Sequence, residues 1–430
     1  MERRLRHSLI LLLLGLLLLP AAQQILGLVT EEPLHGINHV ARKPQFSVRN
    51  WFAGTLQDSL LDFTTQQIGF EPSLVRLNNQ LYYSLFHTAH ANKVAIGKGG
   101  ALYDPKQIES ALGMDYAGTP ALLANLLKFR QLQEILQKKN IRLAMVLVPG
   151  KGIGLPHLIP DGYPAPSPAT NYNALKRMTD SLHLPYLDLI NWYKDTKSTS
   201  NFPLYATTGN HWSEYCATLA ADTLIGYLQA YTGTELNRIK VKSVHFPVPA
   251  SIVDNDLNLG MNLMYTPPVP EMAYPEVEFT GRPRKLRVLT IGDSFYSKMF
   301  TEFSGDIFEQ SHFWFYFREL HRREAPAALP TAQVDLRKEI ESQDVILLYM
   351  VDSHLRELGF GFVEAAIAAF QDHPWREQEI ARISKDISRD PNWIGQIATK
   401  ASAIGVPLDT MLRRDAIWVL ENTRVTMVPH

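Results

Sequence analysis

Apolar and polar positions along the chain form two kinds of segment, which are short apolar runs and longer amphipathic stretches. The runs are rich in aliphatic residues and are bounded by polar or turn residues; they cover 94–96, 141–149, 185–189, 286–291 and 344–350. Apolar runs of this length are typical of strands in a sheet that is covered on both faces. We therefore expect these runs to form the strands of a buried sheet.

The stretches between the runs have the spacing of helices. Leucines recur three and four residues apart after Thr119-Pro120, a pair suited to the N-cap and first turn of a helix. Further helices are expected over 169–184 and 213–233. Strands that alternate with helices predict an α/β fold with a parallel, doubly wound sheet and helices on both faces.

Three segments depart from this alternation. Residues 245–280 are rich in proline and are expected to form a long surface insertion. The region between the last two predicted strands is expected to be helical, and residues 373–430 are expected to form a helical C-terminal extension. The predicted organisation is a membrane segment over 1–29, a lead-in over 30–90, a main α/β domain over 91–372 and this extension.

The N-terminal segment predicts export. Three arginines within the first six residues precede a span, residues 8–29, that carries no charge. As a helix this span is about 33 Å long, enough for a bilayer core of about 30 Å. The arginines predict a cytoplasmic N-terminus and a body outside the cytoplasm. A cleaved signal peptide with residues 9–19 as its core is the alternative, although Pro20 is unfavourable near the cleavage site.

Composition limits the classes of partner and cofactor. The formal net charge is -1 over 430 residues, so charge gives no case for a nucleic-acid partner. A single cysteine, Cys216, excludes an intramolecular disulfide and a multi-cysteine metal site. Asp254 and Asp256 resemble part of a calcium loop, but the glycine and terminal glutamate of such a loop are missing. We expect neither a metal ion nor an organic cofactor.

Residues with catalytic chemistry follow the predicted strands, where active sites of open α/β sheets lie. The run at 286–291 leads directly into Gly292-Asp293-Ser294, and His211 stands near a predicted helix start. A serine hydroxyl needs a base, and a histidine kept neutral by a helix N-terminus can serve as one. We predict Ser294 as nucleophile, His211 as general base, and an oxyanion hole at the helix start, Asp293 and Phe295, from the backbone amides after Ser294.

Each of these residues also has a structural explanation. Gly-Asp-Ser is a common turn sequence, Asp293 suits a helix cap, and a histidine beside Trp212 can simply pack or cap. The combination of an apolar strand, Gly-Asp-Ser and His-Trp in an exported α/β domain favours the catalytic interpretation.

In combination the motifs resemble the AlgX/AlgJ-type alginate O-acetyltransferases, a branch of the SGNH hydrolase-like superfamily. "TIGDSF" resembles the nucleophile block, and "PLYATTGNHW" places His-Trp upstream of it, in the permuted order of that branch. The likeness also covers "KVAIGKGGALYD", "VLVPGKG" and "DVILLYMVDSHLRELG", and therefore extends from Val94 to about Phe362. It also includes the single N-terminal membrane segment.

The resemblance implies a mechanism, partners and a location. Ser294 becomes transiently acetylated, while His211 acts first as base and then as acid. The acceptor is an exported polysaccharide, and the acetyl donor is a multi-pass membrane O-acyltransferase. The protein is expected in the bacterial periplasm, anchored to the inner membrane by its N-terminal helix or soluble after cleavage. Lys151, Tyr205, Asn210 and Trp212 are candidates for substrate binding, although the aromatic residues equally suit a core and Lys151 a solvated turn.

The sequence departs from the family pattern at the orienting carboxylate. The family usually has an aspartate two residues before the histidine, where this chain has Gly209. Asp188, at the end of its predicted strand, is the first substitute; Glu214, Asp352 or a backbone carbonyl are the alternatives. Two other functions remain open, an acetylesterase that uses the same residues and an inactive polysaccharide-binding or assembly protein, which Gly209 favours.

Overall fold

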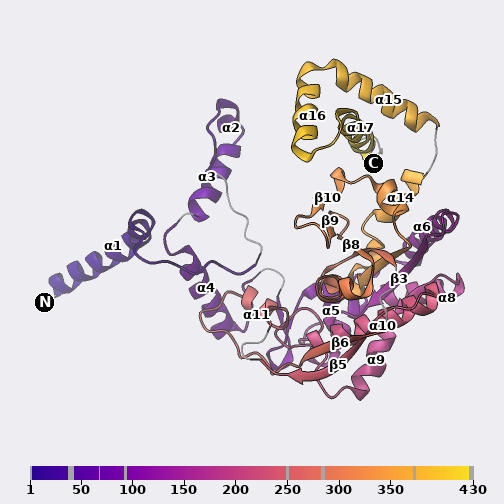
Figure 1. The fold of residues 1–430 in the computed structure, drawn as a ribbon. Helices are drawn as coiled ribbons and strands as arrows, with labels where there is room; N and C mark the ends of the chain where they lie inside the picture. Colours follow the sequence, from indigo (N-terminus) through magenta and orange to yellow (C-terminus); the bar gives the residue numbers. More distant parts are fainter. Residues whose placement is uncertain are drawn as a thin grey trace.

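A computed structural model describes residues 2–36, 43–66, 68–91, 94–247, 251–281, 286–370 and 374–425. The chain has three parts: N-terminal helices that extend away, a central α/β body and a C-terminal group of helices (Figure 1). The body positions the candidate site.

Among the described residues, a seven-stranded sheet forms the centre of the body, in the order β10-β9-β8-β7-β11-β3-β4. Its strands are β3 (Arg142–Val148), β4 (Tyr186–Asp188), β7 (Arg287–Gly292), β8 (Gln310–Phe315), β9 (Glu319–Arg322), β10 (Leu329–Pro330) and β11 (Val345–Val351). The strands from β8 to β4 pair in parallel, while β9 and β10 form an antiparallel edge. The predicted doubly wound α/β fold is confirmed.

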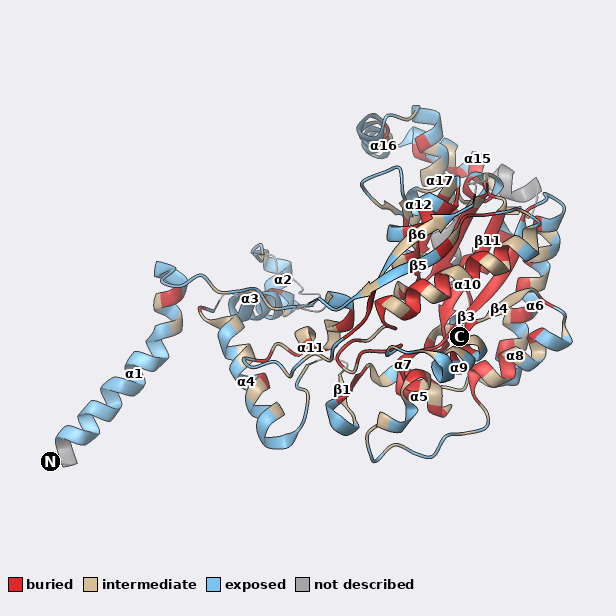
Figure 2. Cartoon of the chain, turned by 60° about the horizontal axis from the view of Figure 1, so that its bottom comes forward, coloured by how far each residue is buried: buried red, intermediate tan, exposed pale blue. Residues whose placement is uncertain are grey.

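Both faces of the sheet are covered, as the apolar runs predict. Alternate residues of β3 enter two separate cores: Ala144, Val146 and Val148 face one, and Leu143 and Met145 the other. The buried strands stand out in Figure 2 beneath exposed helical surfaces. The body helices are α5 (Pro105–Leu112), α6 (Thr119–Gln137), α7 (Lys151–Gly154), α8 (Asn171–Ser181), α9 (Leu189–Thr199), α10 (Glu214–Thr232), α11 (Asp256–Gly260), α12 (Ser304–Ile307), α13 (Leu336–Glu341) and α14 (Phe362–Phe370). Helix α10 packs on the first core, and α6 and α14 pack on the second.

The region between β7 and β11 differs from the helical expectation. It contains β8, β9 and β10 as well as short helices. Strand β8 begins with Gln310, Ser311 and His312, so its sequence lacks the aliphatic run that identifies the other strands. Its pairing with β7 is long-range in the chain and is not visible in local periodicity.

The proline-rich insertion also differs from expectation, because part of it is buried. It is flanked by an antiparallel pair, β5 (Arg238–His245) and β6 (Tyr274–Thr280), and encloses α11. Asp254, Asn258 and Met261 are buried there. The Asn258 amide donates to the Thr208 carbonyl over 3.2 Å, and the Thr208 hydroxyl donates to the Asp254 carbonyl over 2.6 Å. These bonds hold the insertion against the loop that precedes His211.

The two ends of the described chain are helical. The N-terminal helices are α1 (Glu2–Leu26), α2 (Val48–Phe52), α3 (Thr55–Gln66) and α4 (Glu71–Phe86), beside a small pair formed by β1 (Ala95–Ile96) and β2 (Leu102–Tyr103). Within α1, Arg4–Leu26 is long and apolar enough to cross a membrane by length and composition. The C-terminal helices α15 (Pro374–Arg389), α16 (Pro391–Ile404) and α17 (Leu408–Val425) share an apolar core of their own. The expected helical C-terminus is confirmed for residues 374–425.

Candidate active site

Ser294, His211 and Asp256 form a hydrogen-bonded chain at the carboxyl edge of the sheet. The Ser294 Oγ lies 2.7 Å from His211 Nε2, and His211 Nδ1 lies 3.1 Å from Asp256 Oδ2. The second carboxylate oxygen of Asp256 accepts from the amides of Asn210 (2.7 Å) and Leu257 (2.8 Å). With Asp256 ionised, Nδ1 carries the proton, so Nε2 is free to accept the serine proton. The arrangement is that of a nucleophile, a base and an orienting carboxylate.

The turn that carries Ser294 is held by the buried carboxylate of Asp293. Its Oδ1 accepts from the Phe295 amide over 3.1 Å, and its Oδ2 accepts from the Val351 amide over 2.8 Å. The ring of His354 also contacts Oδ2, through Nδ1 at 3.1 Å. Asp293 therefore joins the ends of β7 and β11. The amide of Phe295 is already engaged, so the expectation that this amide supplies the oxyanion hole is corrected.

His211 lies before a helix rather than inside its first turn. Helix α10 begins at Glu214, and Ser213 is its N-cap, whose hydroxyl accepts from the Cys216 amide over 3.1 Å. The His211 ring is instead positioned by packing, with its centroid 4.9 Å from that of Phe295. Trp212 packs edge-on against the same phenylalanine and is buried. Trp212 and Phe295 therefore support the histidine from the core and offer no open platform to a substrate.

The carboxylate that contacts His211 comes from Asp256, 45 residues later in the chain. The structure also explains the glycine that replaces the usual aspartate. A Cβ at Gly209 would lie 2.5 Å from the Val253 carbonyl oxygen and 2.9 Å from the Asp254 carbonyl carbon. The insertion thus fills the space beside Gly209 and supplies a carboxylate of its own from the start of α11.

Replacing Gly209 with alanine is expected to destabilise the fold and to displace Asp256. The added methyl group meets backbone atoms of the insertion, which cannot rotate away as a side chain would. Overpacking of this kind costs about 1–3 kcal/mol. Urea denaturation of the wild type and the variant measures the loss. Gly260→Ala is a matched control, because a Cβ there meets nothing within 4 Å; equal losses in the two variants would contradict the steric account.

The sequence-based candidates for the orienting carboxylate lie elsewhere, so the choice of Asp188 is corrected. Asp188 is the N-cap of α9 and accepts from the Asn191 amide (2.9 Å) and from the Tyr172 hydroxyl (3.0 Å to Oδ2). Glu214 forms an ion pair with Lys298. Asp352 is fully buried and accepts from the Gly150 amide over 2.7 Å. Each carboxylate therefore has a structural role of its own away from His211.

Lys151 holds the loop that precedes His211 and is not exposed to a substrate. Its side chain is fully buried, and Nζ donates to the carbonyls of Thr207 (2.8 Å) and Gly209 (2.6 Å). Burial lowers the pKa of Lys151 to about 7, and the charge of Asp256 opposes that shift. The expectation that Lys151 binds a substrate is corrected, because no part of its side chain reaches the surface.

The other proposed substrate-binding residues are also engaged within the protein. Tyr205 is buried, and its hydroxyl donates to the Pro149 carbonyl over 2.5 Å. The Asn210 side chain accepts from Gln107 over 3.0 Å, while its backbone amide is bonded to Asp256. Tyr205 thus belongs to the core, and Asn210 positions Asp256. Their aromatic or polar character alone did not distinguish these roles.

Asp352 is expected to make stability depend on pH. Burial raises its pKa to about 7 from an ordinary 3.8. Between these values the folded protein holds a proton that the unfolded chain has lost, so the free energy of unfolding falls as pH rises from about 4 to about 7. Asp352→Asn removes this dependence, and its stability relative to wild type should rise by about 4 kcal/mol across the window. Urea denaturation at several pH values tests this; parallel pH profiles would contradict it.

Tyr316 is a site residue that sequence reasoning did not identify. It follows β8, its backbone amide donates to the Gly292 carbonyl over 2.8 Å, and its ring centroid lies 5.5 Å from that of His354, which contacts Asp293. Burial raises the pKa of Tyr316 to about 12, with a further upward contribution from Asp293, so the phenol stays neutral and retains its proton. A neutral phenol near the turn that carries Ser294 can donate a hydrogen bond to a developing oxyanion.

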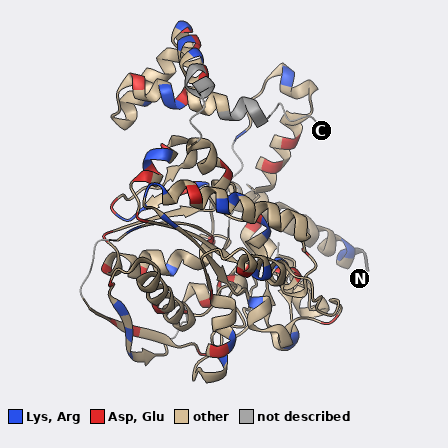
Figure 3. Cartoon of the chain, turned by 90° about the vertical axis from the view of Figure 1, so that its right-hand side faces the viewer, with Lys and Arg blue, Asp and Glu red and all other residues tan. Residues whose placement is uncertain are grey.

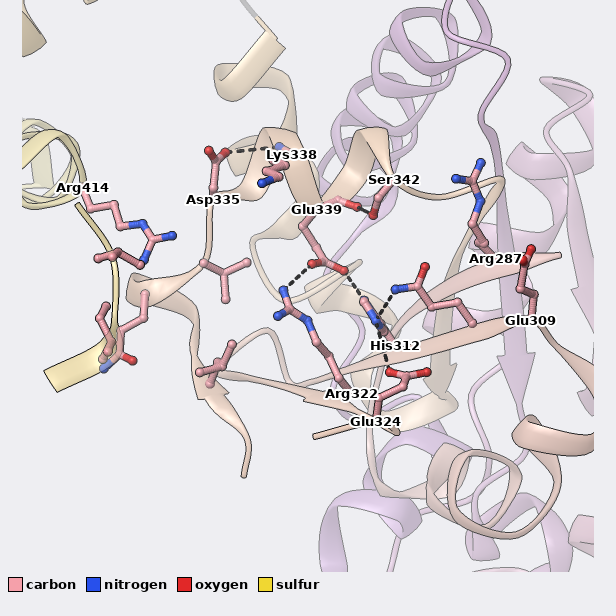
Figure 4. Close-up of a pocket in the computed structure, with 16 residues that line it drawn as sticks. Arg287, Glu309, His312, Arg322, Glu324, Asp335, Lys338, Glu339, Ser342 and Arg414 are labelled. Carbon is pink, nitrogen blue, oxygen red and sulfur yellow. Dashed lines mark hydrogen bonds and ion pairs between the residues drawn. The ribbon is translucent and has the colours of Figure 1, made fainter. Parts of the chain in front are cut away.

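A cavity of about 890 Å³ lies at the opposite ends of the strands from Ser294 (Figure 4). It is lined by the first residues of β7 and β8 and reaches the C-terminal helices at Arg414. Its buried Glu339 forms an ion pair with His312 and accepts from Arg322 over 2.7 Å. Charges of both signs are interspersed here and over the body as drawn in Figure 3. The cavity is away from the Ser294 edge, and its central carboxylate is already paired.

Comparison with protein families identifies one match. Residues 94–248 match the model of an SGNH hydrolase-like domain described as acetyltransferase AlgX. The matched segment contains Lys151, His211 and Trp212 and ends before Asp256 and Ser294. The predicted resemblance to the AlgX/AlgJ-type family is confirmed over this segment. No curated protein sequence matches the chain.

Three solved structures are similar in fold at low sequence identity. The O-acetyltransferase domain of Pseudomonas putida AlgJ has a TM-score of 0.43 and 15% identity, over 61% of this chain and 92% of that one. Pseudomonas aeruginosa AlgX has a TM-score of 0.41 and 11% identity, over 63% and 66%. Bacillus cereus PatB1 has a TM-score of 0.38 and 10% identity, over 57% and 93%. All three TM-scores lie below 0.5, so no conclusion about this chain is drawn from these structures.

Proposed function

We propose that this protein is an extracytoplasmic O-acetyltransferase that moves acetyl groups onto hydroxyls of an exported polysaccharide. The observation that carries the proposal is the chain of hydrogen bonds from Ser294 through His211 to Asp256. The match of residues 94–248 to an acetyltransferase family supports the choice of acyl group and reaction class. Ser294 and His211 are both partly exposed, so a substrate can reach them.

In the first half-reaction Ser294 takes the acetyl group from a donor. The Oγ attacks the acetyl carbonyl carbon while His211 Nε2 accepts the hydroxyl proton. The imidazolium that forms is stabilised by Asp256, whose other oxygen is fixed by two amides. Collapse of the tetrahedral intermediate breaks the bond to the donor, and the leaving group takes the proton from His211. In this proposal the Ser294 amide and the neutral phenol of Tyr316, whose turn is bonded to Gly292, are the donors to the oxyanion.

In the second half-reaction a sugar hydroxyl takes the place of the leaving group. His211 accepts its proton, the sugar oxygen attacks the acetyl carbon, and the bond to Ser294 Oγ breaks. The proton then returns to the serine, so the enzyme is restored and no electrons are transferred. Water in place of the sugar would make the protein an acetylesterase. That alternative uses the same residues and differs only in the acceptor.

The proposal also assigns the reaction to a cellular location, the periplasm. Within α1, Arg4–Leu26 suits an anchor in the inner membrane, which keeps the body in the periplasm. Acetyl-CoA is a cytoplasmic donor, so a periplasmic enzyme needs a membrane protein that passes the acetyl group across the bilayer. A multi-pass O-acyltransferase is the partner that this requirement and the family resemblance favour.

The test is a competition between a sugar and water for the acetyl group. Full-length protein in detergent is supplied with an aryl acetate and with β-linked oligosaccharides of mannuronate, glucose and N-acetylglucosamine. We expect an acetylated oligosaccharide, detected by mass spectrometry, that depends on Ser294. Free acetate alone would favour the esterase. Turnover that equals that of Ser294→Ala would favour the inactive binding protein.

A further inference from the structure

A groove of about 570 Å³ opens among the residues that follow β8 and β11. The residues that line it include Asn125, Tyr316, Phe317, Arg318, Arg356 and Phe360. Tyr316 lines this groove, and its backbone amide donates over 2.8 Å to the carbonyl of Gly292, two residues before Ser294. The groove therefore adjoins the nucleophile.

Three aromatic residues of the groove have backbone conformations that bulky side chains avoid. The φ angles are 48° at Tyr316, 54° at Phe317 and 55° at Phe360. This left-handed region suits glycine and asparagine, and an aromatic residue there is strained. Strained residues persist where the surroundings fix them, and they gather at functional sites. All three line the same groove, so three strained aromatic residues lie together there.

The first two aromatic residues occupy the centre of a tight turn. The Arg318 amide donates to the Phe315 carbonyl over 2.9 Å and closes the turn between β8 and β9. Turns with two positive φ angles usually hold Asn-Gly, which would fit here without strain. The Tyr316 amide donates to the Gly292 carbonyl over 2.8 Å, so the turn is tied to the strand that ends at the nucleophile.

The third aromatic residue comes from the segment after β11. Phe360 stands between Gly359 and Gly361, whose φ angles are 77° and 88°. Its ring centroid lies 5.1 Å from that of Tyr316, with an interplanar angle of 67°. Two separate loops thus bring their aromatic rings together over one groove.

The groove combines aromatic surface with hydrogen-bonding groups, a combination that suits a sugar ring. The C–H faces of a pyranose are apolar and pack on aromatic rings, while its hydroxyls need donors and acceptors. Arg318 is exposed and has no ion-pair partner among the described residues, so its five N–H donors are available. Arg356 lies 3.6 Å from Glu357 and adds a donor beside an acceptor.

We propose that this groove binds a pyranose ring of the acceptor and directs one of its hydroxyls to acetylated Ser294. This inference rests on the proposed function, because a groove beside Ser294 acts as an acceptor subsite only if that serine carries the acetyl group. The bound hydroxyl loses its proton to His211 and gains the acetyl group, and the Ser294 ester bond breaks.

Phe360→Asn tests the groove without imposing new strain. Asparagine adopts the left-handed conformation readily but has no aromatic ring. Full-length protein is titrated with the oligosaccharides of mannuronate, glucose and N-acetylglucosamine to measure sugar affinity. In a second measurement, the rate of acetyl transfer to the sugar is divided by the rate of acetyl-Ser294 formation, which gives a transfer ratio. We expect wild type to bind at least one sugar, and Phe360→Asn to weaken its binding and raise its KM about tenfold. Phe52→Ala, an exposed aromatic on α2 outside the groove, should match wild type.

The outcomes separate the groove from the chemistry. Equal sugar affinity and equal transfer ratios in wild type and Phe360→Asn, or no binding of any of the three sugars, would overturn the inference. If acetyl-Ser294 still forms normally when either of these results is found, the proposed function is unaffected. Conversely, sugar binding that depends on Phe360 without any acetyl-Ser294 would contradict the proposed function and overturn the acceptor role. Circular dichroism checks that Phe360→Asn is folded.

Discussion

Ser294→Ala is expected to lower acetyl transfer by about 10⁴–10⁶-fold, the range in which removal of a nucleophilic serine falls in serine hydrolases. The Oγ is the atom 2.7 Å from His211 Nε2, and alanine leaves the base with nothing to deprotonate. The fold should survive, because Asp293 fixes the turn through the amides of Phe295 and Val351, and the substitution leaves both of these bonds in place. Initial rates with an aryl acetate and an oligosaccharide acceptor measure the loss.

A serine from the same turn provides the control. Ser297 is partly exposed, three residues after the nucleophile, and lies outside the hydrogen-bonded chain to His211. Ser297→Ala should retain transfer within about twofold, as surface substitutions usually do. Similar losses in both variants, or a Ser294→Ala protein that still transfers acetyl groups, would remove Ser294 from the mechanism.

Asp256→Asn is expected to lower kcat by about 10³–10⁴-fold, as in other triads that lose the orienting carboxylate. The asparagine fits the same space, but its NH₂ group facing His211 Nδ1 favours the tautomer with the proton on Nε2. That nitrogen then cannot accept the serine proton. Asparagine also lacks the charge that stabilises the imidazolium. The loss should fall on kcat rather than on KM, because Asp256 does not contact the groove that we assign to the acceptor.

Asp188→Asn distinguishes between Asp188 and Asp256 as the carboxylate that orients His211. Asp188 caps α9 and contacts Tyr172, and asparagine is an equally good N-cap, so its replacement is expected to change stability little and to leave kcat within about twofold. Steady-state kinetics of the two variants under the same conditions give the comparison. A large loss of kcat in Asp188→Asn, with little loss in Asp256→Asn, would reverse the assignment.

The parts of the site that the sequence predicts are those with a local signature. The apolar run at β7 ends in Gly292-Asp293-Ser294, and the turn is recognisable because strand, turn and serine are adjacent in the chain. His211 is recognisable from His-Trp before the capped start of α10. The sheet follows from aliphatic runs such as β3 and β11, whose residues are buried on both faces. These features need no knowledge of distant contacts.

The parts that the sequence does not predict depend on distant contacts. Asp256 reaches His211 because β5 and β6 pair and α11 packs against the loop at Thr208, and no local pattern records this. The signal in the sequence is Gly209 together with two aspartates, Asp254 and Asp256, in the proline-rich insertion. Tyr316 is equally hidden, since β8 lacks an aliphatic run and its turn residues are not the usual Asn-Gly. Lys151 was misinterpreted because a lysine in a glycine-rich turn is usually solvated, whereas this one is buried.

The most direct test of the account is the intact mass of full-length protein after brief exposure to an aryl acetate, followed by peptide mapping. The account predicts one added acetyl group on Ser294 in wild type, slower acetylation in Asp256→Asn and none at this position in Ser294→Ala. Addition of the oligosaccharide acceptor should remove the group from wild type. No acetyl group on Ser294 in wild type, or acetylation of Asp256→Asn at the wild-type rate, would contradict the proposed triad.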